Sequence, residues 1–326
     1  FQLDEKNESS SIAGCPPDSF SEDGQLWGNP LYRWDFHRST GYEWWVTRMW
    51  HSFKLNDVVR IAPFRGFDEY FSIPADKGHA KYGHWEKGPG MELFRTIHAR
   101  LGDVNVIAED LGLMTDGVRK LVRDSGYPNM KVLQFASDPS DISFGNDYWP
   151  HNYGRNCVVY TGTHDNETLA GWYAGLDKAA KMQVHGYLGN FDTADKRLYK
   201  AIINATMASV AKDCIIPVQD HLGLDNTCRM NQPGTVGFNW RWRLLPKQLT
   251  AKLAKEVKAM TIQANRANWD AIHAEEEAEE AAEAVREKAG EAAEAVKERA
   301  EEAAEAVRER AEEAAEVVKG KAGKAA

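Results

Sequence analysis

Five short runs of apolar and β-branched residues recur along the first 225 residues of the chain. They are Val58–Ala62, Val104–Ala108, Lys131–Phe135, Cys157–Thr161 and Cys214–Val218. Segments with the apolar spacing of a helix lie between most of them, for example Met91–Leu101 and Asp116–Asp124. Strands that alternate with helices along a sequence favour a parallel β/α architecture.

Polar residues follow the predicted strands, including Glu109–Asp110 and the segment Gly162–Asp165. Functional side chains at the carboxyl ends of successive parallel strands are typical of a (β/α)8 enzyme. Five strands cannot close an eight-stranded barrel, and no comparable runs precede residue 57. We therefore predict an α/β fold over 57–268, an incomplete (β/α)8 TIM barrel made of about the last five strands.

The first 56 residues are expected to form a substrate loop with aromatic, ligand-binding character, followed by a lead-in helix over Tyr42–Ser52. The chain opens with Phe1 rather than Met. This start suggests a fragment, a processed chain or an incomplete gene model.

Composition excludes several classes of protein. The longest apolar runs are strand-sized, so no transmembrane segment is expected. A net charge of −9 argues against a nucleic-acid partner. The four cysteines form no CxxC pair and the ten histidines show no metal-ligand spacing, so we expect neither a disulfide scaffold nor a metal site.

The tail, 269–326, differs from the rest of the chain. Residues 275–326 hold 17 Glu and 9 Lys or Arg, and no aromatic residue lies beyond Trp269. An 11-residue unit repeats four times over 278–321, with valine at the same place in each unit. The first, fourth, fifth and eighth residues of every unit are apolar, which predicts a long amphipathic helix with a coiled-coil-like period.

The sequence allows several interpretations of the tail. Its apolar stripe is mostly alanine and would bury little area against a partner, so a solvated helical extension is the simplest interpretation. Self-association through the tail and a membrane-surface helix are the alternatives, although the excess of Glu argues against tight binding to anionic lipid. The repeat resembles that of group 3 late embryogenesis abundant proteins, which implies a desiccation or membrane-surface role.

Several longer motifs carry a second resemblance. They are AGCPPDSFSEDGQLWGNPLYRWD (13–35), GYEWWVTRM (41–49), VVRIAPFRGFDEYFSIPA (58–75), VIAEDLG (106–112), VVYTGTHDNETLAGW (158–172) and CRMNQPGTVGFNWRWRL (228–244). From about residue 11 to about residue 265 the chain resembles the 4-α-glucanotransferases of glycoside hydrolase family 77, also called amylomaltases or disproportionating enzymes. The resemblance covers the carboxyl-terminal portion of the family's catalytic domain.

The resemblance implies transfer of α-1,4-glucan segments between maltooligosaccharides by a retaining double displacement, with no metal or organic cofactor. Such a reaction needs two carboxyl groups roughly 5 Å apart, one as nucleophile and one as acid/base. The resemblance assigns the acid/base to Glu109 and a third, charge-stabilising carboxylate to Asp165. It also makes His164 a sugar-binding imidazole.

The nucleophile position departs from the family pattern, which reads Arg-Ile-Asp-His-Phe-Arg-Gly-Phe over residues 60–67. Here Ala62 replaces the nucleophilic Asp and Pro63 replaces a sugar-contacting His. Arg60, which orients the nucleophile in the family, has no Asp to hold. Because loss of an essential nucleophile typically costs orders of magnitude in rate, we expect glucan transfer to be impaired.

Aromatic and polar residues of the first 56 complete the predicted substrate site. Trp27, Asn29, Tyr32 and Asp35 lie in the QLWGNPLYRWD loop, where aromatic faces can stack on glucose rings and amides or carboxylates can bind hydroxyls. Core packing is the prediction for the four tryptophans Trp44, Trp45, Trp240 and Trp242. Asn231 and Pro233 are expected to shape a strand-end loop.

Three hypotheses stay open: an impaired 4-α-glucanotransferase, a catalytically dead glucan-binding pseudoenzyme, and a chain whose helical tail is the functional part. The expected partners are α-1,4-glucans or maltooligosaccharides. The resemblance implies a plastid or cytoplasmic location. Five parallel strands leave open edges, so we also expect poor solubility or association of the isolated chain.

Overall fold

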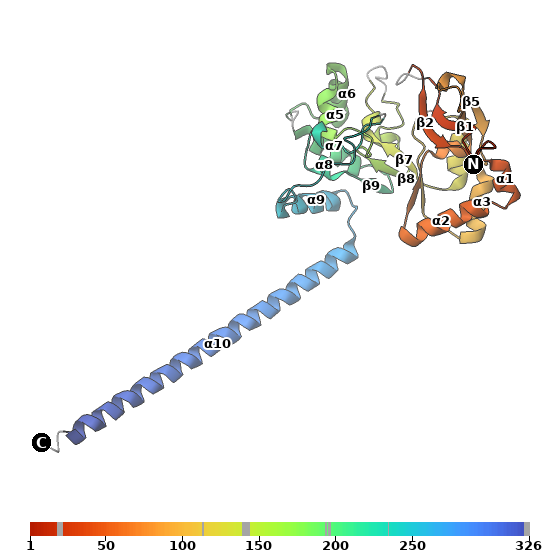
Figure 1. Cartoon of the computed structure of the whole chain (residues 1–326). Helices are drawn as coiled ribbons and strands as arrows, with labels where there is room; N and C mark the ends of the chain where they lie inside the picture. Colours follow the sequence, from red (N-terminus) through yellow and green to blue (C-terminus); the bar gives the residue numbers. More distant parts are fainter. Residues whose placement is uncertain are drawn as a thin grey trace. The chain divides into compact units, whose positions relative to one another are not determined.

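The computed structural model describes residues 1–17, 22–112, 114–138, 144–192, 194, 197–233 and 235–322. The chain divides into two compact units, Phe1–Met260 and Thr261–Ala326, and each is described by itself. The first unit holds two sheets with their helices, and the second is dominated by one long helix (Figure 1).

Within the described residues, five parallel strands form the central sheet in the order β3-β6-β7-β8-β9. They are β3 (Val59–Ile61), β6 (Val106–Ala108), β7 (Asn129–Val132), β8 (Cys157–Tyr160) and β9 (Asp213–Ile215). Their order in the sheet is their order in the chain, as expected for successive crossover connections. The predicted α/β fold with a parallel sheet is confirmed.

Two strand predictions were displaced. The third predicted strand began at Lys131, but β7 spans Asn129–Val132 and Leu133–Phe135 forms a 3-10 turn, η3. Within β7, Met130 N donates a hydrogen bond to the carboxylate of Asp110 at 3.0 Å. The fifth predicted strand ran to Val218, but β9 ends before Pro217, which has no N–H to donate to a neighbour.

A second sheet was not expected. Its order is β2-β1-β4-β5, all antiparallel, with β1 (Ser11–Cys15), β2 (Gln25–Pro30), β4 (Glu69–Pro74) and β5 (His84–Lys87). The expectation that no strands precede residue 57 was therefore wrong. β2 is exposed along its whole length and contains Gly28 at φ +80°, so it lacks the apolar alternation that marks a strand.

Gly14 explains how β1 approaches β2. A Cβ at residue 14 would lie 2.1 Å from the backbone oxygen of Gln25 and 2.4 Å from Cδ1 of Ile73. Only glycine lets the strands come this close. The sequence signal for this strand is hence small residues rather than a hydrophobic run.

Helices α2 (Glu43–Leu55), α3 (Met91–Leu101) and α4 (Asp116–Ser125) pack around one core with β6 and the 3-10 turn η1 (Phe64–Phe67). Leu93, Phe94 and Ile97 of α3 are fully buried. Ile97 lies four residues after Leu93 and three after Phe94, the spacing that places side chains on one face of a helix. Thr115 caps α4 by accepting a hydrogen bond from Val118 N at 3.3 Å. The predicted bounds of α3 are confirmed and those of α4 differ by one residue.

The remaining elements of the first unit are short. They are α1 (Trp34–Ser39), η2 (Ala80–Tyr82), η4 (Pro150–Asn152), α5 (Leu169–Gly175), α6 (Lys178–Leu188), α7 (Leu198–Met207), α8 (Val218–His221), η6 (Asn226–Cys228) and α9 (Ala251–Gln263), which continues into the second unit. Among them, α7 is largely buried through Leu198, Ile202 and Ile203.

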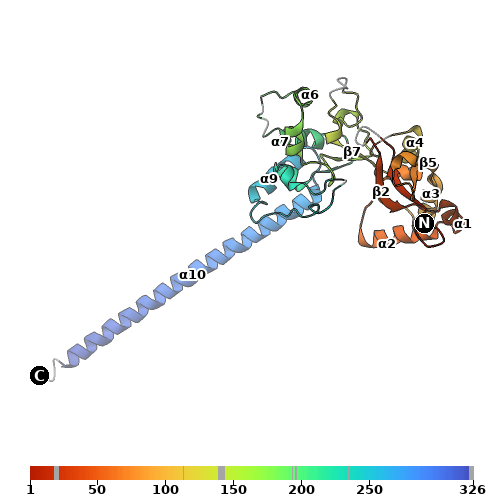
Figure 2. The same cartoon turned by 45° about the horizontal axis from the view of Figure 1, so that its top comes forward.

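The second unit contains α10 (Trp269–Ala322), a single helix of 54 residues (Figures 1 and 2). The predicted helical tail is confirmed. Val285, Val296 and Val307 of the repeat are each between 68% and 69% exposed, so this part of the valine stripe faces solvent. In the part of the chain that the structure describes, no helix combines the length and apolarity needed to cross a membrane.

Candidate active site

The site lies where parallel strands end at one edge of the central sheet. Glu109 N donates to the carbonyl of Ile61 at 3.0 Å, and Phe64 N donates to the carbonyl of Glu109 at 2.8 Å. These bonds extend the β3–β6 pairing beyond the strands and place Ala62 beside Glu109. A side chain at position 62 and the carboxyl of Glu109 therefore share this edge.

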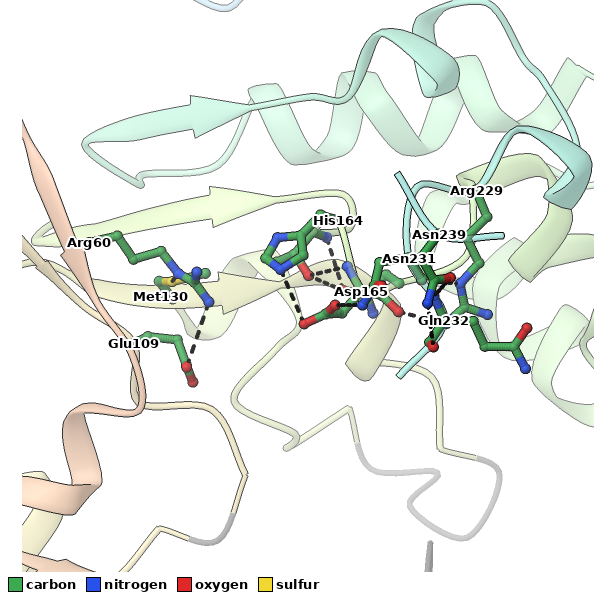
Figure 3. Close-up of polar contacts among 11 residues, drawn as sticks. Arg60, Glu109, Met130, His164, Asp165, Arg229, Asn231, Gln232 and Asn239 are labelled. Atoms are coloured by element: carbon green, nitrogen blue, oxygen red, sulfur yellow. Dashed lines mark hydrogen bonds and ion pairs between the residues drawn. The ribbon is translucent and has the colours of Figure 1, made fainter. Parts of the chain in front are cut away.

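Glu109 is held in a partly buried position, with its side chain 12% exposed. Oε1 accepts a hydrogen bond from Leu111 N at 3.0 Å, and Oε2 lies 3.6 Å from Nη2 of Arg60 (Figure 3). Burial raises the pKa of Glu109, and the charges of Asp110 and Asp165 raise it further against the opposing effects of Leu111 N and Arg60. A carboxyl group with a raised pKa suits a general acid.

Arg60 of β3 reaches groups at the next two strands of the sheet, β6 and β7. Besides its contact with Glu109, its Nε donates to Sδ of Met130 on β7 at 3.2 Å. Its side chain is 33% exposed. With alanine at position 62, Arg60 pairs with Glu109.

Asp165 and His164 follow β8 and form a second polar group (Figure 3). Oδ1 of Asp165 accepts a hydrogen bond from Asn231 Nδ2 at 2.6 Å, and Oδ2 lies 3.3 Å from Nε2 of His164. Arg229 donates to the backbone oxygen of Asp165 at 2.6 Å, and Asn231 N donates to the backbone oxygen of His164 at 3.0 Å. The segment around Asn231 thus fixes the loop that carries Asp165, in agreement with its predicted shaping role.

An open pocket of about 160 Å³ lies among these strand ends. Its lining residues are Arg60, Met130, Tyr160, Gly162, Thr163, His164, Ile215 and Pro217. They come from β3, β7 and β8 and from the segments that begin at the ends of β8 and β9. Polar groups of the site therefore converge on a concave surface, the usual setting of a small-molecule site.

Comparison with known proteins agrees with this geometry. A family model described as 4-alpha-glucanotransferase, glycoside hydrolase family 77, matches residues 1–250, well over half of the chain. The chain belongs to the 4-alpha-glucanotransferase family.

Relatives carry the same name. The 4-alpha-glucanotransferase of Streptococcus pneumoniae is 44% identical over 266 residues, which cover 80% of this chain and 51% of the relative. The chloroplastic/amyloplastic 4-alpha-glucanotransferase of Solanum tuberosum is 42% identical over 260 residues, which cover 80% of this chain and 44% of the relative. The chain thus spans about half the length of the curated relatives it matches.

A solved structure is also similar. The amylomaltase from Streptococcus agalactiae in complex with acarbose aligns with a TM-score of 0.79 and 38% identity, over 82% of this chain and 53% of that one. The amylomaltase from Corynebacterium glutamicum, 19% identical with a TM-score of 0.61, shares the fold.

The structure brings some of the predicted site residues of this glucanotransferase-family chain together. Arg60 contacts Glu109, and His164 contacts Asp165. Burial is the main cause of the raised pKa of Glu109, and the charge of Asp165 adds the least to it. In the described part of the chain, no group of three or more His, Cys, Asp or Glu residues could hold a metal ion.

The other predicted substrate residues lie elsewhere in the first unit. Trp27 and Asn29 are exposed on β2, and Asp35 is exposed on α1. Tyr32 packs at 5.0 Å from the ring of Trp45 and accepts a hydrogen bond from Arg48 at 2.7 Å. Among the described contacts of these four residues, none reaches Glu109, His164 or Asp165, so their sugar-binding role stays a prediction.

Core packing was predicted for four tryptophans. Trp45 is buried at 5% exposure and Trp242 is only partly buried. The prediction was wrong for Trp44 and Trp240, which are 45% and 53% exposed. Trp44 lies one residue before Trp45, the first of the buried residues Trp45, Val46 and Met49 of α2, and so falls outside the buried face of that helix. Trp240 has φ +64° and lies with its ring 5.2 Å from His164, a proximity that spacing in the sequence could not reveal.

Two further buried carboxylates, Asp110 and Asp220, accept hydrogen bonds from neighbouring segments of the chain. Asp110 accepts hydrogen bonds from Asn129 Nδ2 and Met130 N, both at 3.0 Å. Asp220 of α8 accepts from Thr161 Oγ1 at 2.6 Å and from Leu169 N at 2.7 Å. Burial raises the pKa of Asp220. These contacts fix the segments that flank the site.

Proposed function

We propose that this chain binds α-1,4-glucans at the carboxyl edge of its parallel sheet and carries the acid/base half of a 4-alpha-glucanotransferase site. The observation that carries the proposal is the buried carboxyl of Glu109 beside position 62, with Asp165 close enough to raise its pKa. The family membership supplies the class of substrate. The chain spans about half the length of these relatives. Their activity and substrates are therefore proposed for this chain.

The roles follow from the arrangement. Protonated Glu109 would donate to the oxygen of the leaving glucan and then, as a carboxylate, accept the proton of the acceptor hydroxyl. Asp165, oriented by Asn231 and His164, would stabilise positive charge on the sugar ring and hold hydroxyls. No metal or organic cofactor enters these steps.

Ala62 removes the group that would attack the anomeric carbon. Its methyl offers neither charge nor lone pair, so the first displacement lacks a nucleophile. Glycosyl transfer by this chain should then be impaired by orders of magnitude, as for other enzymes that lose a covalent catalyst. The neighbouring groups remain arranged to bind sugar.

The test is a maltotriose assay that measures released glucose and longer glucans. We expect turnover at background for the chain itself and a rise for the double variant Ala62→Asp/Pro63→His. Adding Glu109→Gln to the double variant should return turnover to background, and Asp147→Ala, an exposed carboxylate of the same unit, is the matched control. Glucose release by the unmodified chain at the rate of the double variant would refute the impairment.

A glucan-binding pseudoenzyme is the second candidate, favoured by alanine at position 62 in an otherwise polar strand edge. It predicts retention on immobilised amylose together with no turnover. A folded sample that shows no retention would count against it.

We also propose that the central sheet corresponds to the last five strands of a (β/α)8 barrel. Its strand order and the alignment with about half of an amylomaltase support this. The boundaries at residues 56 and 268, the plastid or cytoplasmic location and self-association of the tail remain proposals of the same kind. So does a stress-related role of the tail, for which the long helix α10 is the supporting observation.

A further inference from the structure

Trp240 presents an indole ring to solvent next to the candidate active site. The ring is 53% exposed, its centre lies 5.2 Å from that of His164, and the two planes are tilted by 34°. His164 lines the pocket at the strand ends and pairs with Asp165. A large apolar surface thus adjoins polar groups that converge on a concave site.

The backbone holds Trp240 in an uncommon conformation. Its φ of +64° lies in the left-handed region, which residues with a side chain rarely adopt. Trp240 N donates to the carbonyl of Met230 at 2.7 Å, and Arg243 donates to the carbonyl of Trp240 at 3.0 Å. Such backbone outliers persist where surrounding contacts impose them, and they cluster at ligand-binding sites.

Asn239 fixes the turn that precedes the tryptophan. Its Oδ1 accepts a hydrogen bond from Gln232 N at 3.0 Å, and its Nδ2 donates to Thr235 O at 2.9 Å. Figure 3 shows Asn239 and Gln232 beside Asn231, the residue that binds Asp165. The same loop therefore positions both the carboxylate and the indole.

We infer that Trp240 is a stacking platform for one glucose ring of a bound α-1,4-glucan. The C–H face of glucose is apolar and matches an indole face, while its hydroxyls project from the ring edge toward groups such as His164 and Asp165. Burying the exposed indole under a sugar removes apolar surface from water on both partners. This inference rests on the proposed function, since it takes a glucan as the ligand.

Oxidation of tryptophans in the unmodified chain tests the inference without any substitution. N-bromosuccinimide oxidises exposed indoles, and peptide mapping by mass spectrometry reports each one. Trp50 and Trp269, 44% and 46% exposed, are internal controls. We expect saturating maltoheptaose to slow oxidation of Trp240 several-fold and to leave both controls unchanged.

Affinity electrophoresis, in gels that contain amylose or a matrix bearing maltoheptaose, shows independently whether the chain binds glucan. Binding without protection of Trp240 would overturn the inference and leave the proposed function standing. Absence of any binding by the folded chain would overturn both. The two failures are therefore distinguishable.

Substitutions of Trp240 measure how much its ring contributes to glucan affinity. Trp240→Ala should weaken glucan binding about tenfold, which corresponds to about 1.4 kcal/mol. Trp240→Phe, which keeps an aromatic face, should restore most of the affinity, and Trp269→Ala should have no effect. Affinity of Trp240→Ala equal to that of the unmodified chain would contradict the platform.

Discussion

At the scale of single residues, the site is controlled by one charged pair and one missing group. Arg60 and Glu109 pair at 3.6 Å, a distance at which the cation lowers the pKa of the carboxyl, yet burial outweighs it. Desolvation prevails because the glutamate side chain is 12% exposed, and it outweighs the opposing effects of the hydrogen bond from Leu111 N and of the Arg60 charge. The absence of a carboxylate at residue 62 removes a further like charge that would raise this pKa more.

The raised pKa of Glu109 has a consequence for stability. Below its ordinary pKa of 4.5 the group is protonated in both folded and unfolded chains. As the pH rises, the unfolded chain releases its proton first, so the folded state loses stability until the pH passes the folded pKa. Glu109→Gln, which cannot ionise, should raise Tm at neutral pH and lose this advantage as the pH falls toward 4.5.

Thermal unfolding followed by circular dichroism at a series of pH values measures this difference. Glu92→Gln, a glutamate that is half-exposed in an ion pair with Arg38, serves as the comparison. A constant difference in Tm between the unmodified chain and Glu109→Gln at all pH values would contradict a pKa raised by burial.

At the scale of elements, buried carboxylates accept hydrogen bonds from the segments that flank the site. Asp220 of α8 joins the end of β8, through Thr161, to the first turn of α5, through Leu169 N. Asp220 is 1% exposed, so water cannot take its place as the acceptor for Thr161 Oγ1 and Leu169 N. The loop with His164 and Asp165 lies between these two contacts and depends on them for its position.

Asp220→Ala should lower the free energy of unfolding by about 2 kcal/mol, because two buried donors lose their acceptor. Asp220→Asn keeps a carbonyl acceptor and should lose less. Urea denaturation measures both, with Asp147→Ala as the exposed control. Equal stability of Asp220→Ala and the control would show that the buried contacts carry no weight.

At the scale of the whole molecule, the central sheet has an unpaired edge at each end among the residues that the structure describes. β3 and β9 are the end strands of a parallel sheet, and sheets of this kind are normally covered or closed. Large apolar side chains near these edges are exposed, including Val58 at 49% and Ile215 at 45%. Open edges with exposed apolar groups favour association.

We therefore expect the full chain to associate in solution, as measured by sedimentation velocity over a range of concentrations. A truncated chain ending at residue 274 identifies the cause. Association that persists in this truncation would arise from the first unit, which is our expectation, and association that disappears would arise from α10. A monodisperse, sharply melting monomer of the full chain would refute the prediction.

Sequence patterns alone determined the elements whose signal is local. The helix over Met91–Leu101, the four-fold repeat of the tail and the order of the five parallel strands follow from periodicity, because burial of one face imposes a period on the residues. Motifs indicated the family, which the comparisons confirm, and the site residues that those motifs assign stay a prediction. The second sheet escaped this reasoning, since β2 is exposed and β1 pairs through the close approach at Gly14.

Tertiary structure decided what depends on groups distant in the sequence. Whether Arg60 would meet Glu109, and whether burial would raise the pKa of that carboxyl, depends on how two strands pair whose facing residues are 47 positions apart in the sequence. The exposure of Trp240 beside His164 likewise arises from a loop that returns across 76 residues. Desolvation and through-space contact are properties of packing, and no local pattern encodes them.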